Sequence, residues 1–174
     1  MPAAEFRIVR ERCAGDLLVT ARGRQLASRF LVSARYLTAK LDPLVRMGYG
    51  VTQETTTHGQ HVIGNTRTFV GYDRSVSREG YRTILAEGAR RLPALASLEI
   101  IRSFAGLRPF VPDKRPLMGR STLRPNLFVA AGHEGDGITL APITARIVAS
   151  LALGKAPPAR LDGLDPDRFT GVPA

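Results

Sequence analysis

Residues 132–144 combine the features of a ligand-binding turn. They read Gly-His-Glu-Gly-Asp-Gly-Ile-Thr-Leu-Ala-Pro-Ile-Thr, between an apolar run at 127–131 and a stretch with helical spacing at 143–153. Glycines let the backbone approach a ligand closely. The N–H groups at a helix start favour an electron-rich group. The pattern predicts a strand, a turn and a helix that cradle a cofactor, and an ordinary tight strand-to-helix turn is the alternative.

Arg108 is a candidate ligand for a carboxylate. It stands in Gly-Leu-Arg-Pro, at the expected end of a strand. A planar guanidinium can hold a carboxylate through two parallel hydrogen bonds, which fixes its orientation as well as its charge. The alternative is a surface arginine that binds a main-chain carbonyl. Tyr72 is expected either to line a substrate cavity or to end a strand.

The three histidines give no metal site. His58 and His61 flank an expected hairpin turn, and without a third ligand their spacing predicts a solvated turn. His133 could act as a general base, but we favour a histidine that is hydrogen-bonded at a strand end. The single cysteine, Cys13, excludes an intrachain disulfide and a multi-cysteine metal site. We therefore expect no metal, and no catalytic residue can be assigned with certainty.

The net charge of +10 does not predict nucleic-acid binding. Residues 1–104 hold 16 basic and 9 acidic residues and residues 105–174 hold 9 and 6, so the excess is spread along the chain. No aromatic residues alternate with the bases, as a single-strand binder requires. No apolar run approaches a membrane span, and the first residues lack a signal-peptide core. We expect a cytoplasmic protein, with peripheral attachment to the inner membrane as a further possibility.

Hydrophobic spacing predicts an α+β fold in which a largely antiparallel sheet carries flanking helices. The firmest elements are a threonine-rich hairpin, 50–57 and 60–68, and a helix over 78–92 with Ser77 as its N-cap. Pro142 is expected near the first turn of the last helix, and Gly154 just after its end. The remaining expectations are strands at 5–9, at 17–20 after a Gly15-Asp16 turn, at 98–101 and at 104–110; ambiguous strand-like runs at 30–32 and 36–37; a loop at 42–50; and a surface tail at 155–174.

Several motifs together resemble the C-terminal part of the D-amino-acid-oxidase-like flavoproteins. They are the run from Arg102 to Asp113, Pro116-Leu-Met-Gly119, and the run from Pro125 to His133. The segments 63–67, 69–73 and 132–144 are most similar to one branch, the flavin subunits of heteromeric dye-linked dehydrogenases of proline, hydroxyproline or opines, and of hydrogen cyanide synthase. The resemblance covers about residues 13–155.

One expected motif of this family is missing. The family binds its dinucleotide through Gly-x-Gly-x-x-Gly between a strand and a helix, and the 17 glycines contain no such arrangement. At Gly135-x-Gly137, Leu140 occupies the place of the third glycine. We therefore expect about half of an enzyme: a substrate-binding domain at 1–112, and at 113–174 the C-terminal strand and helix of an absent Rossmann-type FAD domain, followed by a tail.

The resemblance implies the roles of the candidate residues. Arg108 would bind the substrate carboxylate and Tyr72 would line the substrate site. The loop and helix start would contact the flavin of FAD, largely through main-chain groups, at Gly132, His133, Gly135, Asp136, Gly137, Ile138 and Thr139. The parent enzyme would oxidise the C–N bond of a small amino or imino acid by hydride transfer.

The resemblance also sets expectations for the chain on its own. It would lack FAD and activity, and it would self-associate through an uncovered docking surface. The parent enzyme could contain other subunits of a heteromeric dehydrogenase. The competing hypotheses are a ligand-binding or protein-interaction module without a cofactor and, less favoured, a basic nucleic-acid binder.

Overall fold

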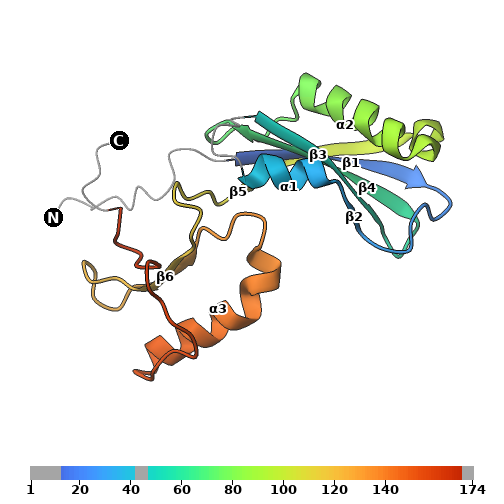
Figure 1. The fold of residues 1–174 in the computed structure, drawn as a ribbon. Helices are drawn as coiled ribbons and strands as arrows, with labels where there is room; N and C mark the ends of the chain where they lie inside the picture. Colours follow the sequence, from blue (N-terminus) through green and yellow to red (C-terminus); the bar gives the residue numbers. More distant parts are fainter. Residues whose placement is uncertain (1–12, 42–46, 170–174) are drawn as a thin grey trace. The chain divides into compact units, whose positions relative to one another are not determined.

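The computed structural model describes residues 13–41 and 47–169, which fall into two compact units (Figure 1). The described part of one unit is residues 13–107 and that of the other is residues 108–169. The strand expected at 5–9 lies outside the described residues. Among the helices of the described ranges, none is long and apolar enough to cross a membrane.

The unit of 13–107 is built on a five-stranded sheet in the order β2-β3-β4-β1-β5. The strands β1 and β4, β3 and β4, and β2 and β3 pair antiparallel, so the expected α+β class is confirmed. The elements of this unit are β1 (Cys13–Arg22), β2 (Leu31–Val32), α1 (Ala34–Leu41), β3 (Met47–Thr55), β4 (Gln60–Phe69), α2 (Arg78–Arg91), the short 3₁₀ helix η1 (Pro93–Ser97) and β5 (Ile100–Arg108).

The hairpin of β3 and β4 forms as predicted, but β3 begins earlier than expected. Gly59 adopts a φ of +82° in the turn. Residues 47–50, expected as part of a loop, belong to the strand. They extend the strand by pairing with β4, Met47 with Thr68 and Tyr49 with Thr66. At Gly50 a Cβ would lie 2.6 Å from the Cα of Tyr36 in α1. The glycine lets α1 pack against β3. Residues 36–37, which read as strand-like, are helical.

The Gly15-Asp16 pair is not a turn. Both residues lie inside β1, where the pairing with β4 shifts between Ala14 and Leu17, as in a β-bulge. Asp16 is 3% exposed and its carboxylate accepts a hydrogen bond from the Ser77 hydroxyl at 3.1 Å. The same hydroxyl accepts from the Gly80 N–H at 2.8 Å, which confirms Ser77 as the N-cap of α2. The bulge thus joins the sheet to the start of the helix.

The apolar face of α2 covers the sheet. Leu18, Ile63, Ile84 and Leu95 form the buried core of this unit. The exposed residues of α2 include Arg82 and Arg90. The strands expected at 98–101 and 104–110 are one continuous strand, β5.

The unit of 108–169 contains a two-stranded antiparallel sheet and a long helix. These elements are β6 (Leu117–Arg120), β7 (Phe128–Ala131) and α3 (Gly137–Ala152). Val111, Leu117 and Val129 form its buried core, against which Phe169 packs.

The segment after α3 is largely exposed, as its composition suggests, but the part from Leu164 to Phe169 is anchored to the unit. The Met118 N–H donates to the Leu164 carbonyl at 2.8 Å. Asp167 is 8% exposed and accepts hydrogen bonds from Ser121 and Thr122 in the loop between β6 and β7. One buried carboxylate therefore anchors the described part of this segment, up to residue 169.

The helix α3 begins earlier than expected and ends as predicted. Because its first residue is Gly137, Pro142 lies in the second turn, not near the first. Its missing N–H leaves the Ile138 carbonyl without the usual helical donor, and such prolines bend helices. At the other end, Gly154 has a φ of +67° and donates to Leu151, while Lys155 donates to Ser150. This is the hydrogen-bond pattern of a Schellman cap.

We expect α3 to promote self-association of the chain. It carries one charged residue, Arg146, and buries only Ile147 within the described structure. Ile138 and the C-cap Leu153 are 94% and 69% exposed. Sedimentation velocity should show a concentration-dependent rise in mass, and the double variant Ile138→Asp, Leu153→Asp should shift the association to about tenfold higher concentration. An unchanged association in this variant would contradict the assignment to α3.

Candidate functional site

The loop between β7 and α3 has an unusual backbone. Gly132 is buried with a φ of +78°, and a Cβ there would come within 2.3 Å of the Val111 side chain. Glu134, which is not a glycine, has a φ of +50°. The Asp136 N–H donates to the His133 carbonyl at 2.9 Å and closes the turn. The predicted strand, glycine-rich turn and helix are therefore present, with a backbone that L-residues rarely adopt.

The start of α3 is open to a ligand. Its first hydrogen bond runs from the Leu140 N–H to the Asp136 carbonyl at 3.0 Å, so the N–H groups of residues 137–139 precede the helical ladder. Asp136 occupies the N-cap position but its side chain makes no capping bond. Ile138 and Thr139 are exposed. This row of main-chain donors at the positive end of a helix fits an electron-rich group such as the pyrimidine edge of a flavin.

His133 ties the loop to the helix. Its Nε2 lies 3.0 Å from the hydroxyl of Thr144, one to two turns into α3. The ring nitrogen is therefore occupied within the fold. This contact agrees with the hydrogen-bonded histidine that the sequence favoured, and it gives the loop a fixed position relative to α3.

Arg108 lies beside this loop in the chain's structure. It is the last residue of β5 and is half-buried. The carbonyl of the next residue, Pro109, accepts a hydrogen bond from the Glu134 N–H at 3.3 Å. The backbone that carries Arg108 is thus bonded directly to the turn that precedes α3, and both belong to the unit of 108–169.

Tyr72 belongs to the other unit. It follows β4 in a turn where Gly71 has a φ of +62°, and its side chain is 69% exposed. Its assignment to the substrate site stays a prediction.

The expectation of a solvated turn at the two histidines is wrong for His61. This residue is fully buried, and its Nδ1 lies 2.9 Å from the Gln53 amide and 3.1 Å from the Thr55 hydroxyl. The ring is a cross-strand link within the β3–β4 hairpin. No cluster of three metal-ligating side chains occurs in the described ranges.

Comparison with known proteins assigns the family. Residues 5–151 match the DAO family model, described as FAD dependent oxidoreductase, and the chain belongs to this family. It is 40% identical over 90 residues to a glycine oxidase of Geobacillus kaustophilus and 39% identical over 105 residues to a D-amino acid dehydrogenase of Paramagnetospirillum magneticum. These alignments cover 52% and 60% of the chain but only 24% and 25% of the relatives.

Solved structures agree with this assignment. The crystal structure of the Geobacillus kaustophilus glycine oxidase matches 92% of this chain with a TM-score of 0.78 at 27% identity, and the match covers 40% of that protein. The L-proline dehydrogenase from P. horikoshii matches 95% of the chain with a TM-score of 0.74 at 26% identity, over 42% of its own length. The chain thus spans about two fifths of these flavoprotein folds.

Proposed function

We propose that this chain is the substrate-binding and flavin-facing part of an FAD-dependent enzyme that oxidises the C–N bond of a small amino or imino acid. The family match and the printed activities of its relatives, glycine oxidase, D-amino acid dehydrogenase and L-proline dehydrogenase, support this reaction class. The observation that carries the proposal is the hydrogen bond between Glu134 and Pro109, because it joins the candidate carboxylate-binding strand end to the candidate flavin loop.

Arg108 would orient the substrate through its carboxylate. An arginine fork fixes two oxygens at once, so the Cα–H of a bound amino acid would take a defined direction. Orientation of this kind lowers the barrier without any proton-transfer role for the arginine. Tyr72 is proposed as a further contact of the substrate.

The loop and the start of α3 would face the flavin. When bound, FAD supplies the acceptor of the substrate hydride. The main-chain N–H groups of Gly137, Ile138 and Thr139 would stabilise negative charge at the edge of the acceptor, as donors in an oxyanion hole do. The remaining assigned contacts are Gly132, His133, Gly135 and Asp136.

The isolated chain should bind FAD weakly and show no turnover. It has no Gly-x-Gly-x-x-Gly segment with which to hold the pyrophosphate. The parent enzyme would work in the cytoplasm or at the face of the inner membrane, with or without other subunits. Measurable amino acid oxidation by residues 1–174 alone would contradict the proposal that the tight FAD contacts lie outside this chain.

A hybrid enzyme tests the proposed function. Residues 5–151 replace the matching segment of the Geobacillus kaustophilus glycine oxidase, and the unaltered oxidase is the control. We expect the purified hybrid to carry the absorption bands of bound flavin, which bleach anaerobically with at least one of glycine, sarcosine, D-alanine, L-proline or hydroxyproline. A folded, flavin-loaded hybrid that none of these compounds reduces would contradict the proposal.

A further inference from the structure

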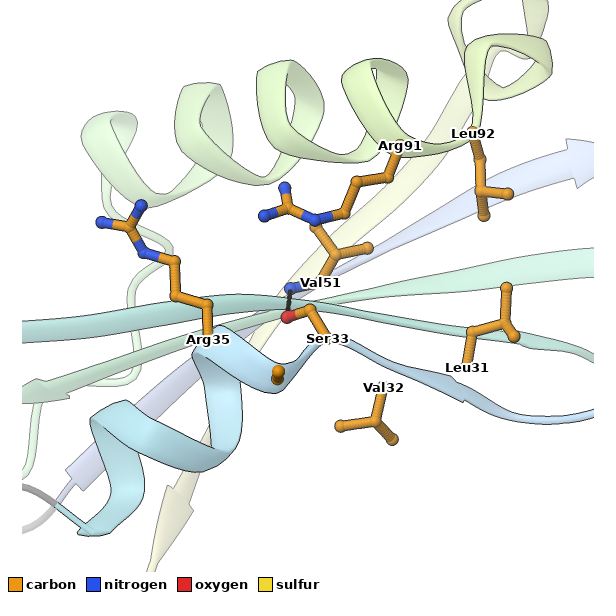
Figure 2. Close-up of a pocket in the computed structure, with 8 residues that line it drawn as sticks. Leu31, Val32, Ser33, Arg35, Val51, Arg91 and Leu92 are labelled. Atoms are coloured by element: carbon orange, nitrogen blue, oxygen red, sulfur yellow. Dashed lines mark hydrogen bonds between the residues drawn. The ribbon is translucent and has the colours of Figure 1, made fainter.

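A groove lies between β2, α1 and the end of α2, within the unit of 13–107. Its volume is about 370 Å³, and its lining includes Leu31, Ser33, Arg35, Val51, Arg91 and Leu92. Figure 2 shows Leu31 and Leu92 pointing toward one another at one end, the guanidinium of Arg91 extending over Val51 in the middle of the view, and the guanidinium of Arg35 at the other end, apart from that of Arg91. The groove is therefore apolar at one end and cationic at the other.

The cationic end has an excess of positive charge. Glu87 forms ion pairs with both Arg90 and Arg91, so one carboxylate is shared by two guanidinium groups. The guanidinium of Arg35 lies over the ring of Tyr49, with its carbon 4.1 Å from the ring centroid. Such stacking leaves the edge of the guanidinium, and with it the N–H donors, available to a carboxylate.

The groove borders an edge of the sheet. The strand β2 pairs with β3 on one side, Leu31 with Gln53 and Val32 with Thr52, and is the outermost strand of the five. Apolar side chains are exposed along this edge: Phe30, which precedes β2, and Leu31 and Val32 within it are 58%, 37% and 41% exposed. Natural edge strands are kept very short, are covered or carry charges that oppose pairing; β2 is short, with two residues, and its apolar side chains are exposed.

We propose that this surface binds an extended acidic segment of another polypeptide by strand addition at β2. The main chain of the segment would continue the sheet beyond β2, an apolar side chain would enter the space between Leu31 and Leu92, and acidic side chains would contact Arg91 and Arg35. The surface has an edge strand, an apolar pocket and two arginines on one side of that pocket. These features meet the requirements of β-augmentation, in which main-chain hydrogen bonds give affinity and pockets give specificity. A nucleic acid or a lipid surface would use the cations but neither the edge nor the pocket.

The charges also set the direction of the segment. Because β2 and β3 run antiparallel, Glu54 lies beyond Gln53 at the end of β3 that is remote from Arg35. The acidic residue of the bound segment therefore lies on the α1 side of its apolar anchor, and a second acidic residue on the other side is disfavoured. This inference does not depend on the flavoenzyme assignment.

A display library of random octapeptides tests the proposal on the intact chain. We expect an enriched family with an apolar anchor and an Asp or Glu on one side of it. Arg35→Gln and Arg91→Gln should each weaken a selected peptide at least tenfold. Arg82→Gln, a matched change at an exposed position of the same helix, should leave its affinity unchanged, and all three variants should keep the parent's circular dichroism spectrum.

Two further arms separate strand addition from simple charge attraction. Methylation of every second main-chain nitrogen of a selected peptide should abolish binding in one register and leave it nearly intact in the other, because only alternate N–H groups face β2. The absence of an enriched acidic family would overturn the proposal. So would equal binding of both methylated forms, or arginine-dependent binding confined to phosphatidylglycerol vesicles or to DNA.

Discussion

Replacing Arg108 with leucine in the hybrid oxidase is expected to lower kcat/KM for its amino acid substrate by about 10²–10³-fold. The loss reflects about 3–4 kcal/mol from two charge-assisted hydrogen bonds and from an unpaired substrate carboxylate. Steady-state kinetics with the best substrate of the hybrid would measure it. The flavin absorption bands of the variant should be retained, because Arg108 is assigned to the substrate and not to the cofactor.

Two comparisons make the Arg108 result specific. Arg108→Lys keeps the charge but loses the planar fork, so it should recover only part of the lost activity. An amine that lacks the carboxylate should be oxidised equally poorly by the parent hybrid and by Arg108→Leu. If Arg108→Leu loses flavin along with activity, or keeps the kcat/KM of the parent hybrid, the assignment to the carboxylate is wrong.

Replacing Asp167 with alanine is expected to lower the free energy of unfolding of the chain by about 3 kcal/mol. The carboxylate accepts hydrogen bonds from the Ser121 hydroxyl at 2.9 Å, the Thr122 N–H at 2.6 Å and the Thr122 hydroxyl at 2.9 Å. Alanine would leave the buried Ser121 hydroxyl and the two Thr122 donors without their acceptor. Urea denaturation followed by circular dichroism would measure the change. Asp162→Asn is the control, since its ion pair with Arg160 is exposed and worth little.

The Asp167 contribution should depend on pH in a defined direction. Burial opposes ionisation of this carboxyl, but the hydrogen bonds from Thr122, Ser121 and Leu123 outweigh it and hold the pKa below its usual value. A group whose pKa is lower when folded stabilises the fold above its unfolded pKa, about 3.9. The stability gap between the parent chain and Asp167→Asn should be full above about pH 5 and shrink as the pH falls further. A gap that widens on acidification would contradict this account.

Local sequence signals predicted the elements that depend on local interactions. The β3–β4 hairpin needs a turn glycine and alternating threonines, and α2 needs a capping serine and an apolar face. Both sets of signals lie within a few residues of the elements that they define. The same holds for the C-terminal cap of α3 at Gly154.

Long-range contacts account for the errors. The sequence around Gly50 predicts a loop, because the close approach of Tyr36 is not visible in it. The anchoring of residues 164–169 is missed because the partners of Asp167 lie 45 and 46 positions away in the chain. His61 is a polar residue next to a turn, which suggests exposure. It is buried because its ring bonds to Gln53 and Thr55 of the neighbouring strand β3. No single-sequence pattern reports such partners.

The spacing of three glycines and one arginine predicted the candidate site, but no sequence signal predicted the contacts that support it. The backbone at Gly132 and Glu134, and the contact of His133 with Thr144, hold the loop in place. The groove at Arg35 and Arg91 combines residues from two distant segments and carries no motif. Its only sequence signal is an apolar pair, Leu31 and Val32, next to arginines.

The irregular pairing at Asp16 makes strand β1 intolerant of length changes. Successive side chains of a strand alternate between faces, so deletion of Gly15 or Asp16 would turn the preceding residues of β1 to the opposite face. Deletion of Asp16 would also remove the acceptor that Ser77 uses at the start of α2. Insertions and deletions among natural variants of this fold should therefore gather at turns such as 56–59. They should avoid positions 14–17, where the loss of one residue would disturb both β1 and the start of α2.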